Sequence, residues 1–246
     1  MRREVRQVGW EGFSGSVIGY GHYGRPVLVF PSEQGRAEDF ENNGMVEAVS
    51  DLIEGGRVKL YCVDSFDGYS WSDLSVPTEE RARRHGRYES WIVEEVLGWV
   101  SQDCGGAAEF ATLGCSLGAF HAANFALKRA DLFPLALCLS GNYDPTGWRA
   151  WGEHGPETYF NNPMSYVQNL HGEHLAWLRD RVSLLLVVGQ GAWEENPTGS
   201  LPSTREFAHR LASKGIRHEL DVWGYDVPHD WPSWRSQLSH HLPRFC

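Results

Sequence analysis

The chain has few cysteines and no long apolar run. Its five cysteines, Cys62, Cys104, Cys115, Cys138 and Cys246, are scattered and odd in number. This usage is typical of free thiols in a reducing compartment, so we expect a cytoplasmic protein. The longest apolar stretches, such as residues 135–139 and 184–188, are far too short to span a bilayer. No apolar run follows the charged residues 1–7, and we therefore expect no secretory signal.

The chain also lacks an excess of positive charge. Its formal net charge is −10 and its pI about 5.5. Nucleic acid and anionic membranes would be repelled by such an average surface, so we expect neither as a partner. The content of 41% hydrophobic and 22% charged residues is ordinary for a globular protein. We predict a single domain over residues 1–246, and a homo-oligomer stays open.

Apolar and turn-forming residues alternate along the chain in a way that indicates strands separated by helices. Residues 3–31 are predicted to be β-structure, with strands at 13–20 and 26–31. Further strands are predicted at 58–63, 110–113, 135–139, 182–188 and 217–223, and helices at 38–54, 78–103, 117–128, 203–214 and 231–242. Residues 141–180 are rich in Trp, Tyr, Asn and Pro and are predicted to be irregular. The alternation predicts an α/β fold: a mostly parallel sheet with antiparallel N-terminal strands and helices on both faces.

One short motif carries the strongest chemical signal. Residues 114–118 read Gly-Cys-Ser-Leu-Gly, which matches the G-x-S-x-G pattern, and they lie between a predicted strand and a predicted helix. This is the nucleophile elbow of the α/β-hydrolase fold, in which a serine projects from a strained turn. The flanking glycines allow the strand and the helix to approach closely. We therefore predict Ser116 as the nucleophile.

A general base should follow the last strand in such a fold. Of the 11 histidines, only His229 lies in the loop between the last predicted strand and the last predicted helix. The order of Ser116 first and His229 last is the one that the α/β-hydrolase arrangement requires. We therefore predict His229 as the base.

The third group should be a carboxylate that orients the imidazole. The loop after the strand at 182–188 reads Gly-Gln-Gly-Ala-Trp-Glu-Glu-Asn and contains no aspartate. We favour Glu194 over Glu195. Asp226 is a rival, although it lies only three residues before His229 and is poorly placed to reach the distal ring nitrogen.

Backbone amides should stabilise the charge that develops on the carbonyl oxygen. The Leu117 N–H opens the helix after the nucleophile and carries a partial positive charge. The second donor should come from the loop after the strand at 26–31, where Ser32 and Glu33 are the candidates.

Aromatic residues are abundant, with 11 tryptophans in the chain. Several of them fall in or near the irregular segment 141–180, which should overhang the site. They can form an aromatic wall for a sugar, aryl or acyl group, or they can simply pack. The candidates for substrate contact are Trp71, Trp148, Trp151, Tyr159 and Phe160.

From the other reactive side chains we expect neither a metal site nor a cofactor. His171 and His174 lack the spacing of a zinc motif and an evident third ligand, and His240 and His241 are adjacent and should point in different directions. Cys115 should point away from the elbow tip and pack.

Several segments together resemble the putative-esterase branch of the α/β hydrolases, which includes the esterase D type and the antigen 85 mycolyltransferases. They are the elbow Gly-Cys-Ser-Leu-Gly-Ala and His-Asp-Trp-Pro-Ser-Trp at 229–234, together with 159–163, 189–195 and 223–226. The resemblance covers about residue 17 to the C-terminus and implies an ester hydrolase. Antigen 85-like members use a glutamate as the acid, whereas esterase D-like members usually carry aspartate, from which this chain departs.

The expected reaction is hydrolysis of a small-molecule carboxylic ester through an acyl-enzyme on Ser116. Acyl transfer to an alcohol and amidase or peptidase action stay open, because the same three groups serve all of these reactions. A non-catalytic binding protein with a hydrolase fold is the alternative from another class.

Overall fold

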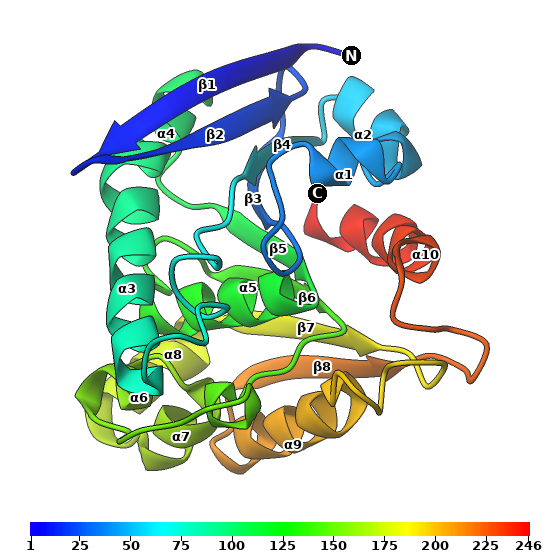
Figure 1. Ribbon diagram of the computed structural model, residues 1–246. Coiled ribbons are helices and arrows are strands. Elements are labelled where there is room, and N and C mark those ends of the chain that lie inside the picture. Colours follow the sequence, from blue (N-terminus) through cyan, green and yellow to red (C-terminus); the bar gives the residue numbers. More distant parts are fainter.

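One mixed eight-stranded sheet forms the centre of the computed structural model, which describes residues 1–246 (Figure 1). The strand order is β1-β2-β4-β3-β5-β6-β7-β8. The first two strands pair antiparallel, and β2 also pairs antiparallel with β4, whereas all the other pairs are parallel. The strands are β1 (Arg3–Trp10), β2 (Phe13–Tyr20), β3 (Arg25–Phe30), β4 (Val58–Val63), β5 (Ala111–Cys115), β6 (Leu135–Leu139), β7 (Ser183–Val188) and β8 (Arg217–Val222). The predicted fold class is therefore confirmed.

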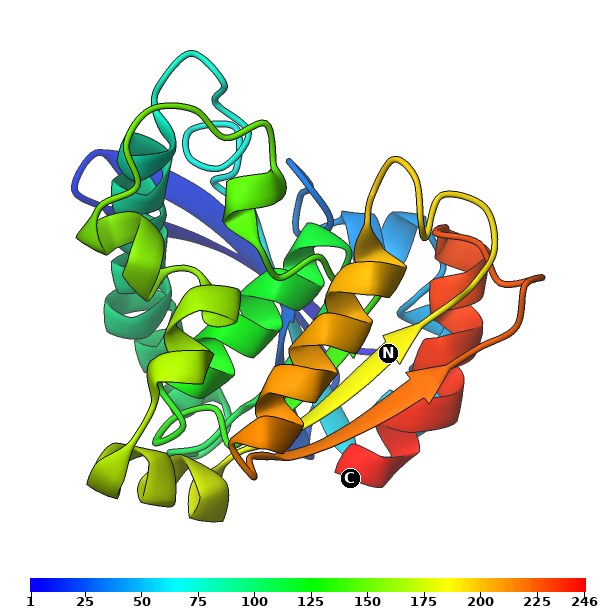
Figure 2. The ribbon, with the colours of Figure 1, turned by 90° about the horizontal axis from the view of Figure 1, so that it is seen from below.

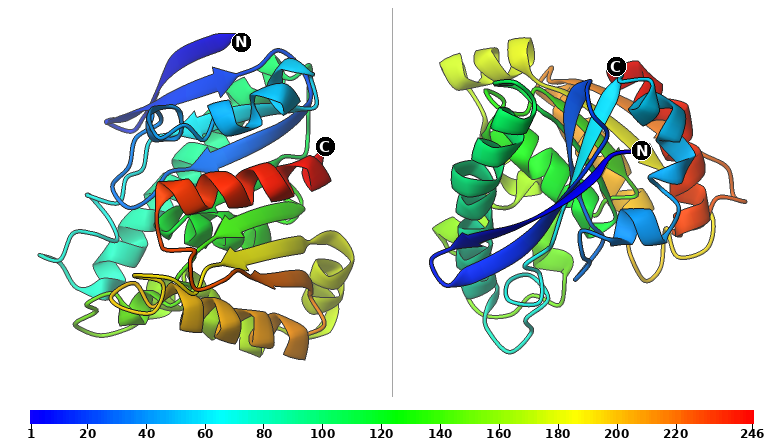
Figure 3. Two further views of the ribbon diagram at one scale, coloured as in Figure 1. Left: turned by 90° about the vertical axis from the view of Figure 1, so that its right-hand side faces the viewer. Right: turned by 90° about the horizontal axis from the view of Figure 1, so that it is seen from above.

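Helices cover both faces of this sheet, as Figure 1 and the right panel of Figure 3 show. They are α1 (Asp39–Asn42), α2 (Ser50–Glu54), α3 (Thr78–Ser90), α4 (Leu97–Asp103), α5 (Leu117–Lys128), α6 (Pro156–Phe160), α7 (Pro163–Tyr166), α8 (Gly172–Arg181), α9 (Ser200–Ser213) and α10 (Trp231–His241). One apolar core contains side chains of α3, α4, α5 and α9, and the other contains side chains of α1, α2 and α10. Because β3 to β7 are covered on both sides, their residues are almost all apolar and buried.

The helix predicted at 38–54 is broken into three short pieces. After α1 the backbone reverses at Gly44, which has φ +73°, and the Met45 N–H donates to the Phe40 carbonyl at 2.9 Å. This is the hydrogen bond of a helix C-terminal motif that glycine favours. A short 3₁₀ turn, η1 (Glu47–Val49), then leads into α2. The Asn-Gly pair at 43–44 was the signal for this break.

The prediction that 141–180 is irregular is wrong for part of the segment, because it contains α6, α7 and most of α8. The proline and asparagine residues interpreted as loop signals begin helices here. Pro156 and Pro163 occupy first helical positions, and the Asn162 side chain accepts the Ser165 N–H at 3.2 Å. A first-turn proline costs no hydrogen bond, and asparagine is a preferred N-cap.

Two side chains of α3 hold this segment in place. The Glu79 carboxylate accepts hydrogen bonds from the N–H groups of Gly155, Glu157 and Thr158 at 2.8–2.9 Å, and from the Thr158 hydroxyl at 2.7 Å. It thus caps α6 as an anion at a helix N-terminus. The buried Arg81 donates to the carbonyls of Trp148 and Arg149, both at 3.2 Å.

The loops that follow the carboxyl ends of β5 to β8 gather at one end of the sheet (Figure 2). In α/β sheets, ligands bind at this edge. The helices are too short or too polar for any of them to span a lipid bilayer.

We expect Glu79→Gln to lower the free energy of unfolding by about 1–2 kcal/mol at neutral pH, because an amide keeps only one acceptor oxygen for several donors. Urea denaturation measures this. Burial opposes ionisation of Glu79, but the hydrogen bonds from Thr158, Glu157 and Gly155 outweigh it and lower its pKa. The stabilisation is therefore full above the unfolded pKa and is lost as the pH falls through the folded pKa.

The difference between wild type and Glu79→Gln should accordingly shrink at acid pH. Glu95→Gln is the matched control, since Glu95 is exposed and makes no side-chain hydrogen bond or ion pair. Equal stability losses in the two variants would contradict the capping role.

Candidate active site

Ser116 occupies a strained turn between β5 and α5. Its backbone has φ +57° and ψ −121°, which is rare for a residue with a side chain. Two glycines make the turn fit. A Cβ on Gly114 would lie 2.1 Å from the Gly118 carbonyl oxygen, and a Cβ on Gly118 would lie 2.4 Å from the carbonyl oxygens of Phe30 and Pro31. No other residue type fits this approach of helix and strands without a backbone shift.

The structure brings His229 to Ser116. His229 lies in the loop between β8 and α10, and its Nε2 is 3.0 Å from Ser116 Oγ. The backbone N–H of His229 donates to the Ala192 carbonyl at 2.9 Å. Trp234 packs edge-on against the imidazole ring, with ring centroids 4.9 Å apart. The imidazole is therefore held in place by both loop backbone and α10.

Of the three carboxylates weighed from the sequence, Glu194 is the one that contacts His229. Its Oε2 is 3.1 Å from His229 Nδ1, and the side chain is fully buried. The other oxygen accepts the Ser140 hydroxyl at 2.5 Å and the Gly189 N–H at 3.3 Å. Glu195 and Asp226 are exposed. With Nδ1–H donating to Glu194, Nε2 is left to accept the Ser116 hydroxyl proton.

Two residues that line the pocket of Ser116 have backbone N–H groups without an acceptor from the protein. Leu117 begins α5, and neither its N–H nor that of Glu33 has a hydrogen-bond partner. Both residues line the same pocket as Ser116, whereas Ser32 does not. The next amide along the loop, Gln34 N–H, is taken by the Asp67 carboxylate at 3.2 Å. The N–H groups of Ser32 and Glu33 are both without a partner, but only Glu33 lines the pocket, and this favours Glu33 as the candidate from the loop.

The buried Asp67 is a residue that the sequence analysis missed. Besides the Gln34 N–H, it accepts a hydrogen bond from His121 Nε2 at 3.0 Å, and both side chains are almost completely buried. His121 belongs to α5, so Asp67 ties the loop of Glu33 to the helix that begins after Ser116. His85 stacks on His121 at 5.1 Å, and burial lowers the pKa of His85 well below its usual value. No motif or periodicity marks these residues in the sequence.

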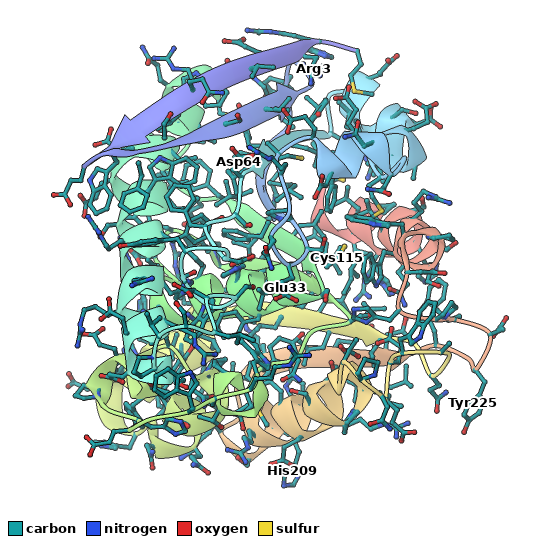
Figure 4. All side chains as sticks on the ribbon, viewed as in Figure 1. Arg3, Glu33, Asp64, Cys115, His209 and Tyr225 are labelled. Atoms are coloured by element: carbon teal, nitrogen blue, oxygen red, sulfur yellow. The ribbon has the colours of Figure 1, made fainter.

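A pocket of about 630 Å³ opens onto Ser116. Trp71 and Trp148 line it, and their rings meet edge to face with centroids 5.5 Å apart. The remaining wall is mostly polar, and Asn142 and the loop 197–200, which no sequence pattern indicated, contribute to it. The carboxylate of Glu33, labelled near the centre of Figure 4, accepts the Ser72 hydroxyl at 2.6 Å.

The other three aromatic candidates do not line the pocket. Trp151 is 47% exposed, and its indole N–H donates to the Leu74 carbonyl at 3.1 Å. Tyr159 and Phe160 lie on α6, where their rings pack against each other and Phe160 is 60% exposed. The cap from Glu79 seats α6 on α3, and this keeps both rings out of the pocket.

The remaining reactive side chains lie apart from this pocket. Cys115 is fully buried in the core beneath the sheet edge, where burial raises the pKa of its thiol well above the usual value. His171 and His174 are exposed on the surface. No three His, Cys, Asp or Glu side chains are grouped to hold a metal ion.

Residues 30–245 match the model of the family described as "Putative esterase". The chain therefore belongs to this family of α/β-hydrolase-fold esterases, as the resemblance implied. No curated protein matches it in sequence.

Solved structures with the same fold include a ferulic acid esterase, with a TM-score of 0.76 and 16% identity over 99% of this chain and 97% of the other. MPT51 (FbpC1) of Mycobacterium tuberculosis has a TM-score of 0.74 and 16% identity over 99% and 97%. An S-formylglutathione hydrolase from Agrobacterium tumefaciens has a TM-score of 0.73 and 16% identity over 98% and 93%. At this identity the likeness shows the shared fold.

The close approach at the elbow can be tested by substitution. We expect Gly114→Ala to lower the free energy of unfolding by at least about 2 kcal/mol, because the new methyl group overlaps the Gly118 carbonyl. Gly98→Ala on α4 is the control. A Cβ there meets nothing within 4 Å, so this change should stabilise the protein by about 0.5–1 kcal/mol. Equal effects of the two substitutions in urea denaturation would contradict the argument.

Proposed function

We propose that the protein hydrolyses a carboxylic ester of a small molecule through an acyl-enzyme on Ser116. The observation that carries the proposal is a pair of hydrogen-bond contacts, from Ser116 to His229 and from His229 to Glu194, with Ser116 at the wall of a pocket. These three groups have the geometry of a nucleophile, a base and an orienting acid. The family membership supports the same reaction.

In the first step His229 Nε2 takes the Ser116 hydroxyl proton while Oγ attacks the ester carbonyl carbon. The imidazolium that forms is stabilised by the Glu194 carboxylate at Nδ1. The carbonyl oxygen becomes negative and accepts hydrogen bonds from the N–H groups of Leu117 and Glu33, each worth about 3 kcal/mol in the transition state. The leaving alcohol then takes the proton from His229.

In the second step His229 removes a proton from water, which attacks the acyl-enzyme carbonyl. Collapse of the second tetrahedral intermediate releases the acid and returns the proton to Ser116 Oγ. Acyl transfer would follow the same path with an alcohol in place of water, and amide cleavage would differ only in the leaving group. The alternative of a non-catalytic binding protein is disfavoured, because the pocket reaches Ser116 and the three side chains are in contact.

The five free cysteines, three of them buried, are in keeping with a reducing compartment and support our proposal of a cytoplasmic location.

Substitution of the three side chains tests the proposal. The wild-type protein should react with a fluorophosphonate probe and hydrolyse p-nitrophenyl acetate. Ser116→Ala should abolish labelling and lower kcat/KM by on the order of 10⁴-fold or more, and Glu194→Gln should lower it by about 10²- to 10⁴-fold. Ser236→Ala, on the exposed side of α10, is the matched control and should behave as wild type. A wild-type protein that shows neither labelling nor hydrolysis would refute the proposal.

Asp67 should act as a positioning residue for the second amide donor. Asp67→Ala removes both acceptor oxygens, so the loop of Glu33 loses its tie to His121. We expect kcat to fall about 10-fold with KM within twofold, because the oxyanion forms only in the transition state. Steady-state kinetics measure this. An equally large change in KM would indicate a merely structural role. So would a fall in kcat that is seen only at temperatures above a lowered Tm.

A further inference from the structure

Arg149 is the only cation that lines the pocket at Ser116, and Glu33 is the only acidic residue there. These two charged side chains differ in their hydrogen bonds. The Glu33 carboxylate accepts a hydrogen bond from Ser72, whereas the Arg149 guanidinium has no hydrogen bond and no ion pair within the chain. A guanidinium presents five donors in a planar fork that matches a carboxylate. Arg149 lines the pocket and is exposed, so these donors are free for a bound molecule.

The backbone of Arg149 is held in an unusual conformation. Its φ is +50°, in the left-handed region that residues with a side chain rarely adopt. The buried guanidinium of Arg81 fixes this turn, because it donates to the carbonyls of Trp148 and Arg149 and also to that of Val76 at 3.0 Å. Such backbone strain persists only where several surrounding contacts hold the residue in that conformation, and it is concentrated at binding sites.

The residue before Arg149 gives the same pocket an aromatic surface. Trp148 precedes Arg149 in the chain, lines the pocket and packs against Trp71 and Phe120, with ring centroids 5.5 and 4.8 Å away. Because both residues line this pocket, an acyl chain or ring that lies on Trp148 can carry its far end to Arg149. The Glu33 carboxylate would repel an anion on its side, which leaves one favourable orientation for a substrate with a single negative charge.

We infer that Arg149 forms an anion-binding subsite that selects esters carrying a carboxylate. This inference rests on the proposed function, since it describes the substrate class of the same site. The formal net charge of the chain is −10, so the average surface repels an anionic substrate. A local cation offsets this repulsion at the pocket, and its effect weakens as salt screens it.

Two p-nitrophenyl esters with the same leaving group test the subsite: p-nitrophenyl butyrate, which is neutral, and mono-p-nitrophenyl glutarate, which ends in a carboxylate. We expect Arg149→Gln to lower kcat/KM for the glutarate ester about 10-fold, as loss of a charge-assisted hydrogen bond at a partly solvated site does, and to leave the butyrate ester within twofold. Arg149→Lys should retain part of the preference. Raising the NaCl concentration should reduce the glutarate rate of the wild type more than its butyrate rate.

Arg6→Gln is the matched control, since Arg6 is an exposed, unpaired arginine on β1, outside the pocket. It should change neither ester by more than twofold. If Arg149→Gln lowers both esters equally, or neither, the subsite is refuted while hydrolysis by wild type still upholds the proposed function. If wild type hydrolyses neither ester and resists the fluorophosphonate probe, the proposed function itself fails.

Discussion

The backbone contact between α5 and the two central strands is the constraint on which the rest of the site depends. Gly118 brings the first turn of α5 against the carbonyls of Phe30 and Pro31, and Gly114 lies against the Gly118 carbonyl. This contact holds Ser116 at its positive φ and places Leu117, the first residue of α5, at the pocket. It also sets the loop after β3 beside the elbow. The proposed nucleophile and both proposed oxyanion donors therefore take their positions from one close approach of main chain to main chain.

Much of the fold and part of the site could be predicted because short-range signals carry them. Periodicity located the strands, and the order of strand, elbow and last loop singled out Ser116 and His229. The choice between Glu194 and Glu195 needed more, because neighbouring residues of a loop have no fixed direction. In the structure Trp193 has φ +69° and is 58% exposed, and Glu194 turns inward to the Ser140 hydroxyl and the Gly189 N–H. Ser140 lies on another segment, after β6, and Gly189 opens the loop that contains Glu194; no sequence pattern indicates either contact.

The sequence could not predict the polar contacts between residues that lie far apart in the chain. Asp67 and His121 meet across 54 positions of the chain, and Glu79 caps a helix that begins 77 positions later. Each of these side chains satisfies backbone or ring donors that only the folded structure brings together. Three of the five aromatic candidates, Trp151, Tyr159 and Phe160, lie outside the pocket for a related reason. Composition marked 141–180 as aromatic, but the cap and the buried arginine decide which rings turn toward the pocket.

The buried Arg81 has a consequence for how the pocket receives a molecule. Its charge is compensated by three carbonyl oxygens rather than by a carboxylate, and two of these belong to the turn at Trp148 and Arg149. If that turn swung outward, it would leave a cation stranded in an apolar interior, which is costly. This wall is therefore pre-shaped rather than hinged. A bound molecule must therefore fit this wall as it stands, because the wall adapts little to each one.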